Sequence, residues 1–281
     1  MAAGLTWADR DGFDHQLAAY ARVAATTRSP LPELLSLIDH AGAAAIDGRY
    51  QEADEQLALA GRRSESIDDP FLTNNINAAQ LGVDRELGQL ARHSQRLSDG
   101  DAGPWRHVFS AHIRCQTGHL EAATCEFEQA LAHLDTLLEG FTRRRNLALL
   151  AETALPLHHS HGASVLAARM EPELRYGLCV IVGPNAFLGA VRRYLGLLAQ
   201  TTGDATSAIE HHHAALKLHQ SMRAAGWTAR SHYDLGLALR MRGRPGDQKH
   251  ADELLTRARA AAHHLGMVKL LREIHAVTVR S

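Results

Sequence analysis

The sequence lacks most of the features that would assign a chain to a functional class at once. It has no excess charge of either sign, because 30 basic and 31 acidic residues give a formal net charge of -1 at pH 7. No strong field therefore attracts nucleic acid or an anionic membrane. The longest apolar stretch, GLCVIVGPNAFLGAV, holds a proline and is shorter than the roughly 20 residues that span a bilayer. The N-terminus, MAAGLTWADRDGFD, shows no signal peptide, so we expect a soluble, cytoplasmic protein.

Cysteines and catalytic motifs are also scarce. The three cysteines, Cys115, Cys125 and Cys179, form no CxxC pair, which suits a reducing compartment better than a disulfide framework. The chain contains no G-x-x-x-x-G-K-[ST], no HExxH and no G-x-S-x-G motif. His112 precedes Cys115 by three residues on a predicted helix, but such pairs arise by chance. We expect no catalytic residue, no cofactor and no metal ion.

Helix-forming residues dominate what is present, and strand signals are nearly absent. Apolar residues recur every three or four positions in segments such as HLEAATCEFEQALAHL, which is typical of amphipathic helices. Breaks that contain glycine separate these segments at intervals of 30 to 44 residues. Each glycine is predicted to end one helix shortly before the next begins, because glycine tolerates positive φ. The predicted turn residues are Gly48, Gly88, Gly118, Gly162, Gly203 and Gly243.

The residues after these glycines follow a repeat pattern of bulky and small side chains. Small residues let two antiparallel helices approach, and bulky ones fill the groove between pairs. Gly88 and Gly162 fit the pattern poorly, and those two repeats rest on the interval alone. The matching sets are Tyr50, Ala53, Leu57 and Ala60; Leu120, Ala123, Phe127 and Ala130; and Ala205, Ala208, His212 and Ala215.

This pattern resembles the tetratricopeptide (TPR) repeat. We expect an all-α protein, a right-handed α-solenoid of about six TPR-like helix-turn-helix repeats. Residues 1–29 would form an N-terminal segment and capping helix, 30–266 the repeat array, and 267–281 a C-terminal helix and tail. The alternative is a generic helical bundle.

Three longer runs resemble a narrower family. GPNAFLGAVRRYLGLLAQTTGD, ALKLHQSMRAAGWTARSHYDLGLALRMRGRPGD and ADELLTRARAAAHHLGM are similar to the C-terminal TPR region of actinobacterial regulators that carry an AAA-type or STAND ATPase, some with a cyclase or LuxR-type domain. The resemblance implies a sensor or partner-binding arm without the ATPase. Gly226 stands where that family usually has proline, before Trp227, so we expect a looser entry to that helix.

The first helix of each TPR pair lines a concave groove, which identifies candidate binding residues. Several arginines there could hold an acidic peptide or a terminal carboxylate, because guanidinium makes paired hydrogen bonds to carboxylate. Solvated charges on a helix face are the alternative. The groove candidates are Trp105, His112, Cys115, Gln116, Glu152, His159, Arg193, Gln200, Arg230, Tyr233 and Arg240.

The 19 histidines suggest metal binding, but their spacing does not support it. His158 and His161 could share a helix face, yet no carboxylate or thiolate nearby completes a ligand set. The consecutive His211, His212 and His213 point about 100° apart on a helix and cannot all reach one ion. We expect a semi-buried His212 between two solvated neighbours.

The leading functional hypothesis is a scaffold that binds a protein or peptide partner in its groove, in transcriptional or signalling regulation. A small-molecule sensor is the first alternative, and an enzyme that uses groove His, Tyr or Arg residues is the second. We expect no direct nucleic-acid or membrane binding. The last helix, MVKLLREIHAVTV, has apolar residues on more than one side and could support a homodimer.

Overall fold

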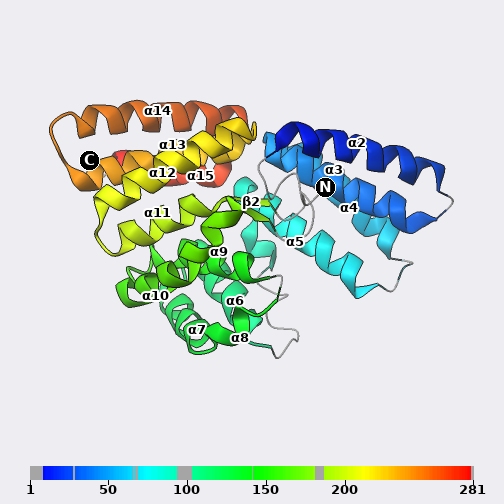
Figure 1. Ribbon diagram of the computed structural model, residues 1–281, viewed down its shortest axis with the longest axis horizontal. Coiled ribbons are helices and arrows are strands. Elements are labelled where there is room, and N and C mark those ends of the chain that lie inside the picture. The colour runs from blue at the N-terminus through cyan, green and yellow to red at the C-terminus, as the bar shows by residue number, and fades with distance from the viewer. Residues whose placement is uncertain are drawn as a thin grey trace.

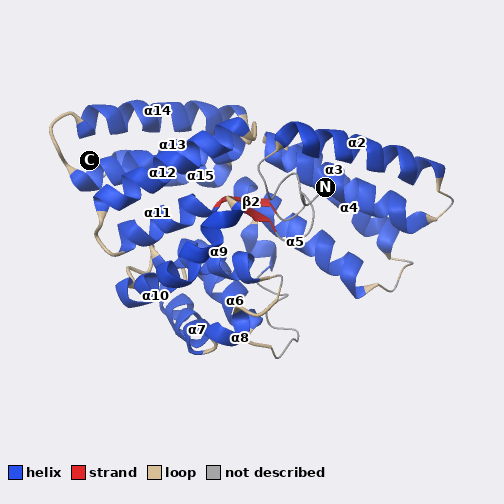
Figure 2. Ribbon diagram, in the orientation of Figure 1, coloured by secondary structure: helices blue, strands red, loops and turns tan. Residues whose placement is uncertain are grey.

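The chain folds into helices that pack on their neighbours in sequence (Figures 1 and 2), which confirms the all-α class. The computed structural model describes residues 9–27, 29–65, 67, 69–93, 103–140, 142–180 and 187–279. No helix in these ranges is long and apolar enough to cross a membrane. The helices are α2 (Arg10–Thr26), α3 (Pro30–Asp47), α4 (Tyr50–Ser64), α5 (Pro70–Leu87), η1 (Leu90–His93), α6 (Trp105–Gln116), α7 (Leu120–Ala132), α8 (Leu134–Leu137), α9 (Arg143–Ala154), α10 (Ser160–Met170), η3 (Glu171–Tyr176), α11 (Val191–Thr201), α12 (Ala205–Ser221), α13 (Ala225–Arg242), α14 (Asp247–His264) and α15 (Val268–Val279).

Five of the six predicted turn glycines lie where a helix ends. Gly48, Gly88, Gly118, Gly203 and Gly243 follow α3, α5, α6, α11 and α13, with φ between 65° and 87°. Residues with a side chain rarely adopt this left-handed conformation, so glycine is favoured at each of these chain reversals.

The prediction for Gly162 is wrong. This glycine lies in the first turn of α10, and the reversal before α10 is made by His158, with φ of 52°. A Cβ at Gly162 would come within 2.8 Å of the Phe127 ring and 2.9 Å of Leu131. Gly162 therefore permits close packing of α10 on α7. Arg223, with φ of 53°, makes the turn between α12 and α13, also without glycine.

Most of the predicted packing positions are buried between paired helices. His212 has no exposed surface, so it is more deeply buried than predicted. Leu120 contradicts the pattern, because this first residue of α7 is 46% exposed. The buried members of the three sets are Tyr50, Ala53, Leu57, Ala60, Ala123, Phe127, Ala130, Ala208, His212 and Ala215.

A short two-stranded ribbon interrupts the helices, where the sequence predicted none. Strand β1 (Leu178–Val180) pairs antiparallel with β2 (Phe187–Ala190). The Phe187 ring packs edge-on against Trp227 at 6.0 Å, so the ribbon is fastened to the start of α13. Periodicity could not reveal these strands, because a short apolar run suits a buried helix and a strand equally.

The chain returns on itself, so that the ends of its first helices meet the ends of its last ones near the centre of Figure 1. Helix α3 packs on α13, and α5 packs on α15. One apolar cluster accordingly joins both ends, with Tyr50, Ala229 and Ile274 among its members. A second cluster fills the space between α6, α7, α9, α10 and α11.

The sequence predicted that Gly226 loosens the entry to α13, and this prediction is wrong. Gly226 is buried in the first turn of that helix. A Cβ at Gly226 would lie 1.8 Å from the Tyr50 hydroxyl oxygen of α4. The missing side chain therefore lets the N-terminal helices dock tightly against α13.

Candidate functional site

Charged side chains from five helices meet in the interior, where α5, α9, α11, α13 and α15 face one another. We call this group the inner ion network. Six of its members are almost inaccessible, and Lys269 and Glu273 are partly exposed. Its members are Arg85, Glu86, Glu152, Arg193, Arg230, Asp234, Lys269 and Glu273.

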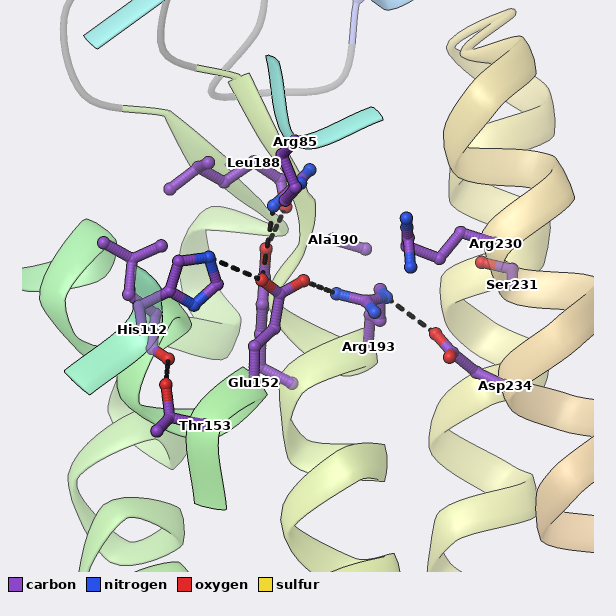
Figure 3. Close-up of polar contacts among 12 residues, drawn as sticks. Arg85, His112, Glu152, Thr153, Leu188, Ala190, Arg193, Arg230, Ser231 and Asp234 are labelled. Atoms are coloured by element: carbon purple, nitrogen blue, oxygen red, sulfur yellow. Dashed lines mark hydrogen bonds and ion pairs between the residues drawn. The ribbon is translucent and has the colours of Figure 1, made fainter. Parts of the chain in front are cut away.

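Glu152 of α9 is the first centre of the network (Figure 3). One of its oxygens accepts a hydrogen bond from Arg193 Nη1, and the other lies 3.3 Å from Arg85 Nη1. Arg193 Nε in turn donates to Asp234 Oδ2 over 2.7 Å. Burial alone would raise the pKa of Glu152, but Arg85 and Arg193 hold it well below its usual range. The carboxylate is therefore ionised and clamped between two guanidinium groups.

Arg230 of α13 is the second centre. Its Nη2 donates to Glu86 Oε2 over 2.8 Å, and its Nη1 lies 3.2 Å from Glu273 Oε2. Arg85 Nε also donates to Glu86, over 2.8 Å, which connects the two centres. Burial favours a raised pKa for Glu86, yet Arg230 and Arg85 outweigh it and lower this pKa to about 2.

An indole ring lies beneath the guanidinium groups. The Cζ atoms of Arg85 and Arg193 lie 4.8 and 5.5 Å from the ring centroid of Trp227. A cation over an aromatic face is attracted by the ring quadrupole, more strongly when water is excluded. Trp227 was noted in the sequence only as part of the family resemblance. In the structure its ring packs against two arginines of the network.

His112 and Cys115 of α6 border the network but are unsuited to acid–base or nucleophilic work. His112 Nε2 lies 3.9 Å from Glu152 Oε2 (Figure 3). Burial, only partly opposed by Glu152, lowers the pKa of His112 to about 3. Burial likewise raises the pKa of the Cys115 thiol to about 11. Near neutral pH both groups are uncharged, whereas a thiolate–imidazolium pair needs the opposite shifts.

Two further buried histidines stabilise the fold. His212 Nε2 donates to the side-chain oxygen of Gln200 over 2.8 Å, which holds α12 against α11. His219 Nε2 accepts from the Ala190 amide over 2.8 Å, so its Nδ1 carries the proton and donates to Ser231 Oγ over 2.7 Å. Burial and nearby Arg193 lower the pKa of both imidazoles to about 3.

Tyr233 lies beside the network, near Arg230, Asp234 and Glu273, and Arg240 lies farther out. Tyr233 is half-buried and packs against the cluster shared by both chain ends. Arg240 donates to the Val277 carbonyl and pairs with Asp252, at 2.8 Å, near the surface.

Three other candidates lie away from the network. His159 caps α10 by accepting from the Gly162 amide. Trp105 is 40% exposed, and Gln116 is half-buried at the end of α6. Of the eleven candidates, the structure gathers His112, Cys115, Glu152, Arg193, Arg230 and Tyr233 at or beside the network.

Features at the surface offer weaker sites than the inner ion network. No group of three or more His, Cys, Asp or Glu side chains within the described ranges could hold a metal ion. A shallow hollow at the surface is lined by α14 as far as Arg257 and by its preceding turn, and the lining includes Lys249 and Asp252. One helix forms its walls, so few groups converge there.

The inner ion network is balanced, with four basic and four acidic members. Its guanidinium groups already hold carboxylates of the same chain. A ligand carboxylate would therefore bind only by exchange for one of them. No protein-family model, curated protein or solved structure matches this chain.

Proposed function

We propose that this chain is a TPR-like helical-repeat protein that binds a protein or peptide partner on the face formed by its inner helices, and serves transcriptional or signalling regulation. The supporting observation is the row of guanidinium groups of Arg85, Arg193 and Arg230, which come from three different helices and all hold carboxylates. Guanidinium recognises carboxylate through paired hydrogen bonds, so this face suits acidic side chains or a chain terminus. The resemblance to the TPR arms of regulators supports the same role.

A capture experiment with neighbouring variants tests this function. Arg192 and Arg193 are adjacent on α11, but Arg192 is exposed and Arg193 is buried in the network. We expect immobilised wild-type protein and Arg192→Gln to retain the same partner from the source cells. Arg193→Gln should lose it while keeping its helical circular dichroism.

Two results would count against the proposal. One is a partner retained equally by Arg193→Gln, and the other is the absence of any partner specific to the wild type. If Arg193→Gln fails to fold, wild-type capture challenged with free oligoglutamate peptide gives the same information, because an acidic competitor should release the partner.

A further inference from the structure

The docking of the first helices on the last ones is built from contacts far apart in sequence. At the outer edge, Arg223 Nη2 pairs with Asp11 at 2.7 Å and Asp14 at 2.8 Å. Arg10 Nη1 donates to the Met222 carbonyl over 3.1 Å. At the inner edge, Glu86 of α5 is held by Arg230 of α13. The ends of α2 and α5 are thus fastened to the turn before α13 and to α13 itself.

The inner edge of this seam between the first and last helices is held by a buried ion pair, Glu86 with Arg230, which is unusual for a permanent interface. Apolar side chains of similar volume stabilise a buried interface as well as ion pairs or better, because each buried charge must be desolvated. Arg230 nevertheless takes two carboxylates, Glu86 from the N-terminal helices and Glu273 from the adjacent α15. If Glu86 departs, Arg230 keeps Glu273 and regains capacity for one more carboxylate. The ion-paired edge of the seam is therefore suited to exchange, whereas the apolar cluster that includes Tyr50, Ala229 and Ile274 holds the rest of it.

We propose that helices α2–α5 form a latch against α13 and α15, and that Glu86 holds the guanidinium group of Arg230 that an acidic segment of a partner protein takes when the latch opens. This inference rests on the proposed function and specifies its partner as acidic. Binding then requires the open state, so its apparent affinity is reduced in proportion to the fraction of open molecules.

A disulfide across the latch tests this directly. A Cβ at Gly88 would lie 3.6 Å from Val268 Cβ, which matches the Cβ separation of a disulfide. Gly88 has a φ of 72°, so the single Gly88→Cys variant serves as the control for local strain. The exposed Cys125 is replaced by serine to prevent mispairing. The probe is a fluorescein-labelled oligoglutamate peptide, compared with oligoglutamine.

We expect the reduced Gly88→Cys/Val268→Cys protein to bind oligoglutamate like the single variant. Oxidation should weaken binding by at least about tenfold, and reductant should restore it. Equal binding by oxidised and reduced protein would overturn the latch while leaving partner binding intact. Binding of oligoglutamate no better than oligoglutamine in the reduced state would overturn the acidic partner.

A second variant tests the exchange itself. Glu86→Gln removes the internal competitor but keeps the shape of the side chain, and Glu55→Gln on the exposed face of α4 is the matched control. We expect Glu86→Gln alone to bind oligoglutamate several-fold more tightly than wild type. Unchanged or weaker binding by a folded Glu86→Gln protein contradicts the proposal. A partner recovered by capture that proves to be basic would overturn both this inference and the carboxylate recognition on which the proposed function rests.

Discussion

Individual glycines serve two different purposes in this chain. Gly48, with φ of 84°, reverses the chain direction, whereas Gly226 leaves room for the Tyr50 hydroxyl. The first purpose could be predicted, because turn glycines recur at regular intervals with a local pattern after them. The second could not, since the side chain that needs the space belongs to a distant helix.

The close contact at Gly226 predicts a specific loss of stability. Gly226→Ala places a methyl group against the hydroxyl end of the buried Tyr50, which must shift to make room, and overpacking of this kind costs about 1–3 kcal/mol. Urea unfolding followed by circular dichroism measures it. Gly61→Ala is the control, because nothing lies within 4 Å of a Cβ there and alanine favours helix by up to about 1 kcal/mol. Equal stability of Gly226→Ala and wild type would contradict the tight docking of α4 on α13.

The buried histidines predict acid sensitivity. Their pKa values are lowered to about 3 for His112, His212 and His219, against about 6.5 in an unfolded chain. Between these pH values the three histidines are protonated in the unfolded chain but neutral in the folded one. The free energy of unfolding therefore falls as pH falls from about 6.5 to 3. Each histidine contributes a slope of about 1.4 kcal/mol per pH unit. The raised pKa of Asp234, caused by burial, opposes this fall.

Urea midpoints measured between pH 7 and pH 4 test this sensitivity. His212→Asn should reduce the slope, although it also weakens the fold at pH 7, and His263→Asn on the exposed end of α14 is the control for the same substitution outside the core. A urea midpoint of the wild type that stays constant between pH 7 and pH 4 would contradict the conclusion that these buried imidazoles are neutral in the folded state.

At the scale of helices, the sequence could show which residues face inward but not which partners they meet. Counting back from the turn glycines placed Glu152, Arg193 and Arg230 on inner faces, and the structure brings them into one network. Asp234, one turn after Arg230 on α13, could have been found by the same count. Arg85 and Glu86 could not, because the repeat around Gly88 fits the pattern poorly and their partners lie on other helices.

The network predicts that an inner carboxylate matters far more than an outer one. Glu152→Gln leaves Arg85 and Arg193 short of a charge partner, and breaking a buried pair in this way costs about 3–5 kcal/mol. Glu128→Gln on α7 removes an exposed carboxylate near His159 and should cost less than about 1 kcal/mol. Thermal unfolding of the two variants compares them. Similar melting temperatures would mean that water reaches Glu152.

For the whole molecule, the closed arrangement changes how the chain should open. The sequence predicted an open array with an accessible groove, and in such an array each repeat contacts only its neighbours, so unfolding can start at either end. Here α3 packs on α13 and α5 on α15, so the first helices are held by the last. These contacts join residues far apart in sequence, and local repeat patterns contain no information about them.

Amide hydrogen exchange distinguishes a latched chain from an open one. In Glu86→Gln the link from α5 to Arg230 is weakened, so amides of α2–α5 should lose protection together, by about tenfold for each 1.4 kcal/mol lost. Amides of α10, which packs on α9 and α11, should keep wild-type protection. If protection falls equally in all helices, Glu86 contributes only to global stability. If it falls in α2–α5 alone, these helices separate as one unit while the rest stays folded, as an acidic partner exchanging for Glu86 would require.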